Sequence, residues 1–341
     1  MHTQTRTTQL KAAALTLTVL LAGAAVAQAQ TFSPDTEKSR IESSQLAAKF
    51  GPVPKPAAGV QMGGVMKALS NEYWQLLRTG YLKGAEKYGV KVDAQAPSNE
   101  SDQIGQLSMM NTMIGKGYKA LLVSPQSDVN LLPGIERAGK TSLVINVNDA
   151  VAPTAAHFVG NSQYDNGVSV ANYLLKTFPK GGQVAVIEGQ AGVYAAKQRT
   201  LGFKTTLAKN PALKIVASVP ADWDRQKAFS TARDLLRHYP DLTAFYCNND
   251  TMALGVVEAV KSANRLGKTL VFGTDGINAA YDSIKKGELT GTVDSFPILT
   301  GKVAVEVAVR LMAGQKLPKV VATPQALVMK SNMAQYEQFR K

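Results

Sequence analysis

Two short stretches of this 341-residue sequence place a tryptophan close to a residue with a planar amide or carboxylate group. Trp74 follows Asn71 and Tyr73, and Trp223 follows Asp222; the chain has only these two tryptophans. Flat aromatic rings cover the C–H faces of a sugar or polyol, while carboxylate and amide groups satisfy its hydroxyls once water has left. The combination predicts a binding site for a small polyhydroxylated molecule.

Short apolar runs alternate with helical patterns along most of the chain. Strands are predicted at residues 60–66, 90–95, 119–124, 142–147, 156–160, 183–188, 213–219, 243–248, 269–273 and 290–294. Helices are predicted between most of them, at residues 71–88, 102–116, 163–177, 194–208, 225–238, 250–264 and 298–313. Strands that alternate with helices form βαβ units and parallel sheets.

These strands are apolar on both faces, as at residues 120–123 and 143–145. That pattern is typical of parallel sheets covered by helices on either side. About ten strands are more than one open sheet comfortably holds. The sequence therefore predicts an α/β protein made of two doubly wound, parallel-sheet lobes.

Polar and aromatic residues gather just beyond the predicted strand ends. They are Lys67, Asn71, Tyr73, Trp74, Asn148, Asp149, Asp222, Trp223, Asn249, Asp250, Asp275 and Asn278. Ligands of open parallel sheets bind in the crevice outside the carboxyl ends of the strands. Both tryptophans fall in this set, which places the predicted binding site at these ends.

Several of these residues also have a purely structural interpretation. Trp74 could belong to the core beneath its helix. Asp250 is expected to be the N-cap of the helix that follows it, and Asp222 could be an acidic residue at a helix start. Asp275 could sit in a plain turn, and Asn249 is ambiguous on sequence alone.

Five motifs in order give the chain a resemblance to the ribose-binding-protein family, a branch of the type I periplasmic sugar-binding proteins, over residues 60–331. They are ALSNEYW (68–74), GQAGVYAAKQRTLGF (189–203), PADWDRQKA (220–228), NNDTMALGVVEA (248–259) and VFGTDG (271–276). The resemblance implies sugar-binding roles for the matching residues Asn71, Tyr73, Trp74, Arg199, Trp223, Asn249 and Asp275. It also implies a hinged protein that closes over its ligand without catalysis.

Two positions depart from the family pattern. After the fourth strand, where the family often has Asp-Arg, strict register gives Val147, with Asn148 and Asp149 beside it. We expect either Asn148 or Asp149 to replace the aspartate. Near the hinge, Ser295 stands at the family's Gln position, where the resemblance implies a ligand-binding role for it, and Asp294 adds a charge beside it. These changes argue against ribose and leave other pentoses, hexoses, inositol and short polyols open, while the Tyr and Trp surfaces favour a hexose or cyclic polyol.

The resemblance also implies a domain organisation and a partner. The chain would pass between the lobes near residues 161, 295 and 324, which makes a three-strand hinge. The N-terminal lobe would hold residues 59–161 and 296–324, and the C-terminal lobe residues 162–295 and 325–341. A monomer would present its closed form to an ABC permease in the inner membrane. A chemoreceptor or sensor kinase is the alternative partner, and the sequence leaves that choice open.

The N-terminus has the pattern of a cleaved signal peptide over residues 1–29. Arg6 and Lys11 flank the start of an apolar run at 12–27, and Ala27-Gln28-Ala29 supplies the small residues of a cleavage site. The run is shorter than the ~20 residues that span a bilayer. We therefore expect export to the periplasm, with cleavage after Ala29.

Residues 30–58 are rich in Pro, Ser, Lys and Glu and end in Gly-Pro-Val-Pro-Lys-Pro before Gly59. This composition predicts a linker, with one short helix near residues 38–50. The ordered fold is expected to begin near Gly59.

The basic charge of the chain does not indicate a nucleic-acid partner. Removal of Arg6 and Lys11 with the signal peptide lowers the net charge from +13 to +11, and no run of five basic residues is present. Regulators of the lactose-repressor type share a two-lobed core but carry a helix-turn-helix headpiece. A signal peptide and a linker take that place here, so no nucleic acid is expected.

The residues of a catalyst or a metal site are not evident in the sequence. Only His157 and His238 follow the signal peptide, and neither a G-x-S-x-G elbow, nor a P-loop, nor a G-x-G-x-x-G motif is present. The single cysteine, Cys247, ends an apolar run and is predicted to be a buried small side chain. We expect no catalytic residue, no metal and no cofactor.

Overall fold

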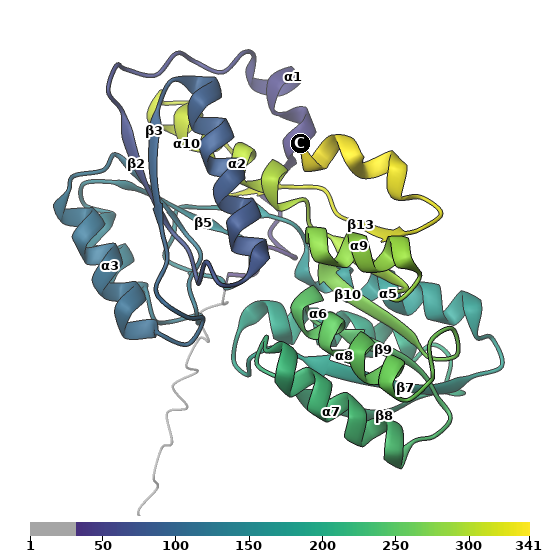
Figure 1. Cartoon of the computed structure of the whole chain (residues 1–341). Helices are drawn as coiled ribbons and strands as arrows, with labels where there is room; N and C mark the ends of the chain where they lie inside the picture. The colour runs from purple at the N-terminus through teal and green to yellow at the C-terminus, as the bar shows by residue number, and fades with distance from the viewer. Residues whose placement is uncertain (1–31) are drawn as a thin grey trace, which may run out of the picture. The chain divides into compact units, whose positions relative to one another are not determined.

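The computed structural model describes residues 32–341, which fold around two β-sheets (Figure 1). The first sheet has the order β1 (Arg40–Glu42), β12 (Val320–Ala322), β6 (His157–Gly160), β5 (Leu143–Val147), β4 (Ala120–Val123), β2 (Gln61–Val65) and β3 (Lys91–Gln95). All neighbouring strands of this sheet run parallel. The predicted signal peptide, residues 1–29, lies outside the described residues.

The second sheet is parallel except at one edge. Its order is β13 (Ala326–Met329), β11 (Gly291–Asp294), β10 (Leu270–Asp275), β9 (Leu242–Cys247), β7 (Gly182–Glu188) and β8 (Leu213–Pro220). Only the β11–β13 pair is antiparallel. The prediction of an α/β fold with two parallel-sheet lobes is therefore confirmed.

Helices connect the strands and cover the sheets (Figure 1). They are α1 (Leu46–Phe50), α2 (Glu72–Tyr88), α3 (Gln103–Gly115), α4 (Leu132–Ala138), α5 (Gln163–Thr177), α6 (Tyr194–Leu207), α7 (Arg225–His238), α8 (Asp250–Ser262), α9 (Asn278–Lys286) and α10 (Pro297–Met312). Two 3₁₀ segments, η1 (Ser43–Gln45) and η2 (Met333–Arg340), complete the described part of the chain.

Central strands are apolar throughout because each of their faces is buried against different helices. In β9, Phe245 and Cys247 pack in the core with α7 and α8, whereas Ala244 and Tyr246 pack with α5 and α6. Successive side chains of a strand point to opposite faces, so one short run contributes to two cores. Cys247 is buried as predicted.

The chain passes between the two sheets at three places. These are residues 161–162 between β6 and α5, residues 295–296 between β11 and α10, and residues 323–325 between β12 and β13. Helix α10 follows the second sheet in sequence but packs on α2, β5 and β6 of the first sheet. Three adjacent connections are therefore the covalent links between the two halves of the described chain.

The prediction of a linker over residues 30–58 is wrong for residues 40–50, although the short helix expected near residues 38–50 is present as α1. Strand β1 pairs with β12 at the edge of the first sheet, and η1 and α1 follow it. Ile41 and Leu46 are buried, with exposed fractions of 4% and 1%. The partner of this short strand lies 280 residues later in the chain, so no local pattern could predict the strand.

No helix of residues 32–341 is both long enough and apolar enough to cross a membrane. The same residues contain no cluster of three or more His, Cys, Asp or Glu side chains that could hold a metal ion.

If residues 40–50 belong to the fold, Leu46→Ala should lower the free energy of unfolding by about 2–4 kcal/mol, the usual cost of truncating a buried leucine. Urea unfolding followed by circular dichroism measures this change. Lys49→Ala, on the exposed face of the same helix, is the matched control and should stay within about 0.5 kcal/mol of wild type. Equal free energies of unfolding for the two variants would show that residues 40–50 are a linker and not part of the folded core.

Candidate ligand-binding site

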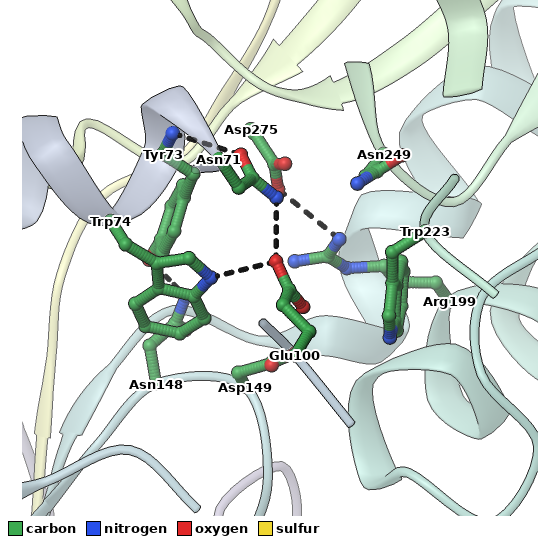
Figure 2. Close-up of a pocket in the computed structure, with 10 residues that line it drawn as sticks. All are labelled: Asn71, Tyr73, Trp74, Glu100, Asn148, Asp149, Arg199, Trp223, Asn249 and Asp275. Atoms are coloured by element: carbon green, nitrogen blue, oxygen red, sulfur yellow. Dashed lines mark hydrogen bonds and ion pairs between the residues drawn. The ribbon is translucent and has the colours of Figure 1, made fainter. Parts of the chain in front are cut away.

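A small cavity lies where the carboxyl ends of the two sheets meet (Figure 2). It is lined by Asn71, Tyr73, Trp74, Glu100, Asn148, Asp149, Arg199, Trp223, Asn249 and Asp275. Every predicted ligand residue except Ser295 lines this cavity. Glu100 is the one lining residue that sequence reasoning missed.

Asn71 links the start of α2 to Glu100 by hydrogen bonds. Its Oδ1 accepts the Tyr73 N–H at 3.1 Å, which makes it the N-cap of the helix, and its Nδ2 donates to Glu100 Oε1 at 2.8 Å. Trp74 Nε1 donates to the same carboxylate oxygen at 3.1 Å. Glu100 is thus held by two neutral donors from the helix opposite.

Glu100 lies in the loop after β3, five residues beyond the last residue of that strand. The rule that ligands bind beyond parallel strand ends applies to β3 as to the other strands. The sequence prediction names no residue after this strand, so Glu100 was missed. Burial raises the pKa of the Glu100 carboxyl, and Lys67 opposes this shift.

The two tryptophans approach the same cavity from different sheets. Lys67 Nζ lies 5.8 Å from the ring centroid of Trp74 and 5.8 Å from that of Trp223. Trp74 is also 2% exposed and packs edge-on against Tyr73, with ring centroids 4.8 Å apart. The Trp74 ring therefore packs in the core and also forms part of the cavity lining.

Trp223 is held by an unusual backbone. Asp222 and Trp223 have φ angles of 55° and 66°, in the left-handed region. The indole ring lies flat against Gly189, where an added Cβ would come within 2.0 Å of it. Trp223 Nε1 is buried and has no hydrogen-bond partner among the described residues. Such an orphaned donor is rare in protein interiors and is available to a ligand.

Three polar residues of the second sheet complete the lining. Arg199 Nη1 donates to the main-chain oxygen of Asn248 at 2.5 Å and to Asp275 Oδ1 at 3.2 Å. Asn249 caps α8 by accepting the Met252 N–H at 2.9 Å, and its amide nitrogen is directed toward Arg199 and Asp275 (Figure 2). Burial raises the pKa of Asp275, and the guanidinium of Arg199 opposes this shift.

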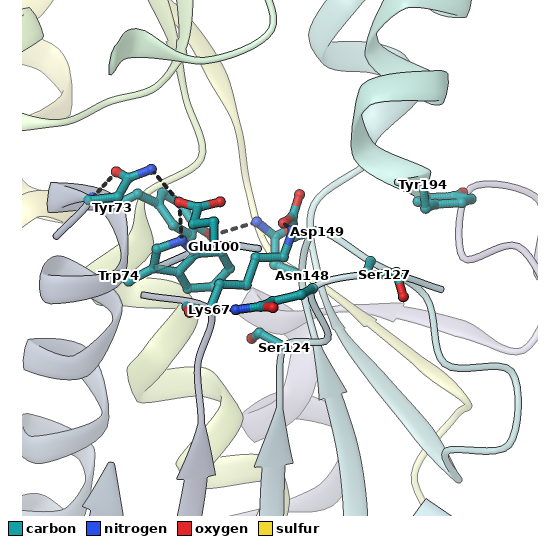
Figure 3. A network of polar contacts seen from close by, with 12 residues as sticks. Lys67, Tyr73, Trp74, Glu100, Ser124, Ser127, Asn148, Asp149 and Tyr194 are labelled. Atoms are coloured by element: carbon teal, nitrogen blue, oxygen red, sulfur yellow. Dashed lines mark hydrogen bonds and ion pairs between the residues drawn. The ribbon is translucent and has the colours of Figure 1, made fainter. Parts of the chain in front are cut away.

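Asn148 and Asp149 both line the cavity. Both residues are therefore placed where either could replace the aspartate of the family pattern. Their φ angles are 47° and 55°, a conformation that Asn and Asp tolerate better than most residues. Asp149 forms a buried ion pair with Lys67 (Figure 3). Asn148 Nδ2 donates to the Tyr73 hydroxyl at 2.5 Å.

Ser295 is buried in the second connection between the sheets and does not line the cavity. Its Oγ accepts the Asn161 amide at 3.0 Å, and its N–H donates to Asp275 O at 3.2 Å. The expectation that Ser295 reads hydroxyls is not met by this geometry. The Ser side chain has two carbons fewer than that of Gln and lacks its amide, and its hydroxyl bonds to Asn161 in the first connection.

Asp294 also faces away from the cavity. It accepts hydrogen bonds from the Tyr281 hydroxyl at 2.7 Å and the Phe296 N–H at 2.6 Å, and it pairs with Arg340 of η2 at 3.1 Å. Phe296, with a φ of 47°, reverses the chain directly after it. Asp294 therefore braces the hinge region and adds no charge to the site.

The prediction that Asp250 caps α8 is wrong, because the preceding Asn249 takes that position. Asp250 is buried and accepts hydrogen bonds from Gly276 N at 2.8 Å, Ile277 N at 3.1 Å and Thr292 Oγ1 at 2.7 Å. It therefore holds the turn after β10 that presents Asp275.

Asp222 lies two residues before Asp224, the N-cap of α7. Asp224 caps the helix by accepting the Lys227 N–H at 2.7 Å, while Asp222 pairs with the Lys227 ammonium at 2.8 Å on the surface.

Comparison with known proteins gives the family. Residues 62–316 match the model of the periplasmic binding protein domain. The chain is 34% identical over 279 residues to the D-allose-binding periplasmic protein of Escherichia coli, covering 79% of this chain and 89% of that protein. It is 31% identical over 278 residues to a D-ribose/D-allose-binding protein of Pseudomonas aeruginosa, covering 77% and 87% respectively.

A solved structure has the same fold. The periplasmic solute-binding protein of an ABC transporter from Actinobacillus succinogenes, with bound D-allose, superposes with a TM-score of 0.77 at 30% identity, covering 81% of this chain and all of that one. The chain therefore belongs to the periplasmic binding protein family, in its ribose-binding branch. Members of this family bind solutes, which confirms the prediction of a binding protein rather than an enzyme.

The buried aspartates outside the cavity make a pH-dependent prediction. Burial raises the pKa of Asp294 to about 7 and that of Asp250 to about 6. An unfolded Asp releases its proton near pH 4, so between about pH 4 and 7 the folded protein binds more protons than the unfolded chain. The free energy of unfolding should therefore fall as the pH rises through this window, by about 1.4 kcal/mol for each unit by which the folded pKa exceeds the unfolded one.

Asp294→Asn should flatten this pH dependence, because the amide does not titrate. Urea unfolding at half-unit steps from pH 4 to 8 compares the slopes of the two proteins. Asp234→Asn, at an exposed position on α7, is the control and should keep the wild-type slope. Parallel curves for wild type and Asp294→Asn would show that Asp294 is ionised in the folded state over this whole range.

Proposed function

We propose that this chain binds a neutral monosaccharide or cyclic polyol in the cavity between its two lobes and delivers it to an ABC importer. The observation that carries the proposal is the meeting of Trp74 and Trp223, from different sheets, on one cavity edged with amides and carboxylates. A sugar ring between them would stack on aromatic surface and replace water at the polar edge.

The lining offers unused hydrogen-bonding capacity of both kinds. Trp223 Nε1 is a donor without a partner among residues 32–341. Asp275, Asp149 and Glu100 offer carboxylate oxygens as acceptors. Vicinal hydroxyls can donate to one such oxygen and accept from an Arg or Asn nitrogen at once, which is the pattern that Arg199 and Asn249 supply beside Asp275.

Among candidate ligands we place D-allose first. The relatives at 34% and 31% identity are named for D-allose and for D-ribose/D-allose, and the solute-binding protein at 30% identity holds D-allose. Ser295 does not line the cavity, so one residue expected to hydrogen-bond the sugar hydroxyls is not in position to do so. The tryptophan at each side favours a six-membered ring over the smaller ring of a pentofuranose.

Closure of the two lobes would be helped by contacts that cross between them. Glu72, at the start of α2, accepts the N–H groups of Asn278 at 3.0 Å and Ala279 at 3.3 Å, at the first turn of α9. Asp128, after β4, accepts the Tyr194 N–H at 3.1 Å and pairs with Lys197 at 2.9 Å, at the first turn of α6. Neither α6 nor α9 has a side-chain N-cap of its own.

We infer that the three connections at residues 161–162, 295–296 and 323–325 act as the hinge. The N-terminal lobe then holds residues 59–161 and 296–324 together with the β1 and α1 segment, and the C-terminal lobe holds 162–295 and 325–341. In an open form the carboxylates of Glu72 and Asp128 leave their helices, so both helix N-termini lose a cap. Ligand and interlobe carboxylates thus favour the same closed state.

The closed protein would act in the periplasm as a monomer, after removal of a signal peptide at Ala29. Its partner would be the permease of the importer in the inner membrane. A chemoreceptor or a sensor kinase is the second candidate partner, since it would read the same closed surface. Crosslinking with each candidate, in the presence and absence of sugar, separates the two.

Isothermal titration of the mature protein against sugars and polyols tests the binding proposal, and a thermal-shift screen selects the compounds, since binding to the folded state raises the apparent stability. D-Allose is expected to give the largest shift. Trp223→Ala and Asp275→Ala should each weaken binding at least about a hundredfold, as loss of a buried anchor does. Asp234→Ala, on the exposed face of α7, is the control. Wild-type affinity in both site variants would rule out this cavity.

The interlobe carboxylates should set how long the ligand stays bound. Glu72→Ala and Asp128→Ala are each expected to weaken affinity about three- to thirtyfold, the range of a lost helix cap, mainly through faster dissociation. Stopped-flow tryptophan fluorescence measures the dissociation rate. Glu86→Ala removes an exposed glutamate from the same helix as Glu72 and should leave the rate unchanged. A rate as slow as wild type in Glu72→Ala and Asp128→Ala would mean that closure does not use these contacts.

A further inference from the structure

Gln163 is fully buried and does not line the cavity, yet it contacts side chains that do, from both lobes. It is the first residue of α5, immediately after the first connection between the sheets. Asn148, its partner on one side, follows β5 of the first sheet, and Arg199, its partner on the other, belongs to α6 beside the second sheet.

All hydrogen-bonding positions of the Gln163 amide are used. Nε2 donates to Asn148 Oδ1 at 2.6 Å and to Asn161 Oδ1 at 3.1 Å. Oε1 accepts from Arg199 Nε at 2.8 Å and from Asn166 Nδ2 at 3.2 Å. A primary amide has two donor hydrogens and two acceptor lone pairs. Neither a carboxylate nor an apolar side chain of this size can make the same set.

This arrangement determines which way two ligand-facing groups point. Because Gln163 donates to Asn148 Oδ1, the Asn148 amide nitrogen must face the Tyr73 hydroxyl. Because Gln163 accepts from Arg199 Nε, the outer nitrogens of the guanidinium are left to face Asn248 O and Asp275. Both orientations are those seen at the cavity wall (Figure 2).

Close packing of α5 on α6 brings Gln163 within reach of Arg199. A Cβ on Gly167 would lie 2.0 Å from Arg199 O, and one on Gly202 would lie 2.0 Å from Tyr164 O. Glycine at both positions lets the two backbones touch next to the hinge. The register that results puts the start of α5 beside the middle of α6.

We propose that Gln163 is a positioning residue of the sugar site, which orients Asn148 and Arg199 without touching the ligand. The inference rests on the proposed function for its effect on affinity. Its effect on Arg199 exists with or without ligand. The residue thereby joins the polar walls of the two lobes at the hinge, where a movement of either wall is transmitted to the other.

Affinity is the first readout. Gln163→Leu should weaken binding of the best sugar about ten- to hundredfold, because it leaves buried polar partners misplaced. Gln163→Glu keeps the acceptor for Arg199 and loses the donor for Asn148, so an intermediate loss is expected. Gln106→Leu is the matched control: Gln106 is equally buried, bonds to Met66 O and Ser124 O, and touches no cavity side chain. It should cost stability and leave affinity within about twofold.

A double-mutant cycle separates positioning from general destabilisation. If Gln163 acts through Arg199, the loss caused by Gln163→Leu should be at least about fivefold smaller when Arg199 is already Lys. A merely structural role predicts the same loss in both backgrounds. Unchanged affinity in Gln163→Leu, or strictly additive losses, would overturn the assignment.

A ligand-free measurement makes the test independent of the proposed function. In the NMR spectrum of the isotope-labelled protein without sugar, the Arg199 Nε–H resonance, assigned with Arg199→Lys, should be sharp and protected from solvent exchange. It should lose that protection in Gln163→Leu and keep it in Gln106→Leu. If wild type binds no sugar at all, the proposed function fails, and this resonance alone decides the role of Gln163: protection unaltered in Gln163→Leu refutes it.

Discussion

The whole site depends on charge pairs that are buried before any ligand enters. Arg199 with Asp275, and Lys67 with Asp149, lie at 7% exposure or less. An unpaired charge in such a place would cost several kcal/mol, whereas a paired and hydrogen-bonded one is tolerated. The positions of these partners are set by separate elements: Lys67 follows β2, Asp149 follows β5, Arg199 comes from α6 and Asp275 ends β10. The two sheets must therefore hold their strand ends in place for the cavity to remain polar and dry.

Much of this site was predictable because of one geometric rule. The carboxyl ends of parallel strands gather at one edge, so most lining residues between Asn71 and Asp275 could be placed together from the strand pattern. Arg199, within α6, was given only by the family resemblance. The rule does not say which way a side chain turns after the strand. Asn249 takes the capping role expected of Asp250 and also lines the cavity, because one residue at a helix start rotates the side chain by about 100°. The rule also fails for Asp294 and Ser295 at the end of β11. Their side chains bond to Arg340 and Asn161 rather than facing the cavity. Glu100 lies in the loop between β3 and α3, where no motif or aromatic residue marks a binding role in the sequence.

The fold was least predictable where its elements are shortest. Strands β1, β12 and β13 have three or four residues each, too few for alternation to distinguish a strand from a loop. Their pairing partners are also remote in sequence, with Ile41 opposite Val321. Such strands are stabilised by the sheet edge that they join rather than by their own residues. The longer helices, by contrast, could be located closely, because helical periodicity over thirteen residues or more repeats enough to be recognised.

The charge balance of the cavity bears on the class of solute it admits. Glu100, Asp149 and Asp275 bring three carboxylates to the lining, whereas Arg199 and the adjacent Lys67 bring two cations. Both cations are already paired, and Glu100 is held by the neutral donors of Asn71 and Trp74. A sugar phosphate or sugar acid would bring a further negative charge into a space with no free cation among the lining residues, and like charges at close range cost several kcal/mol. A neutral polyol meets no such penalty, because its hydroxyls donate to carboxylates and accept from Arg, Asn and Trp nitrogens. Selectivity for neutral solutes thus follows from the same buried ion pairs that keep the cavity intact.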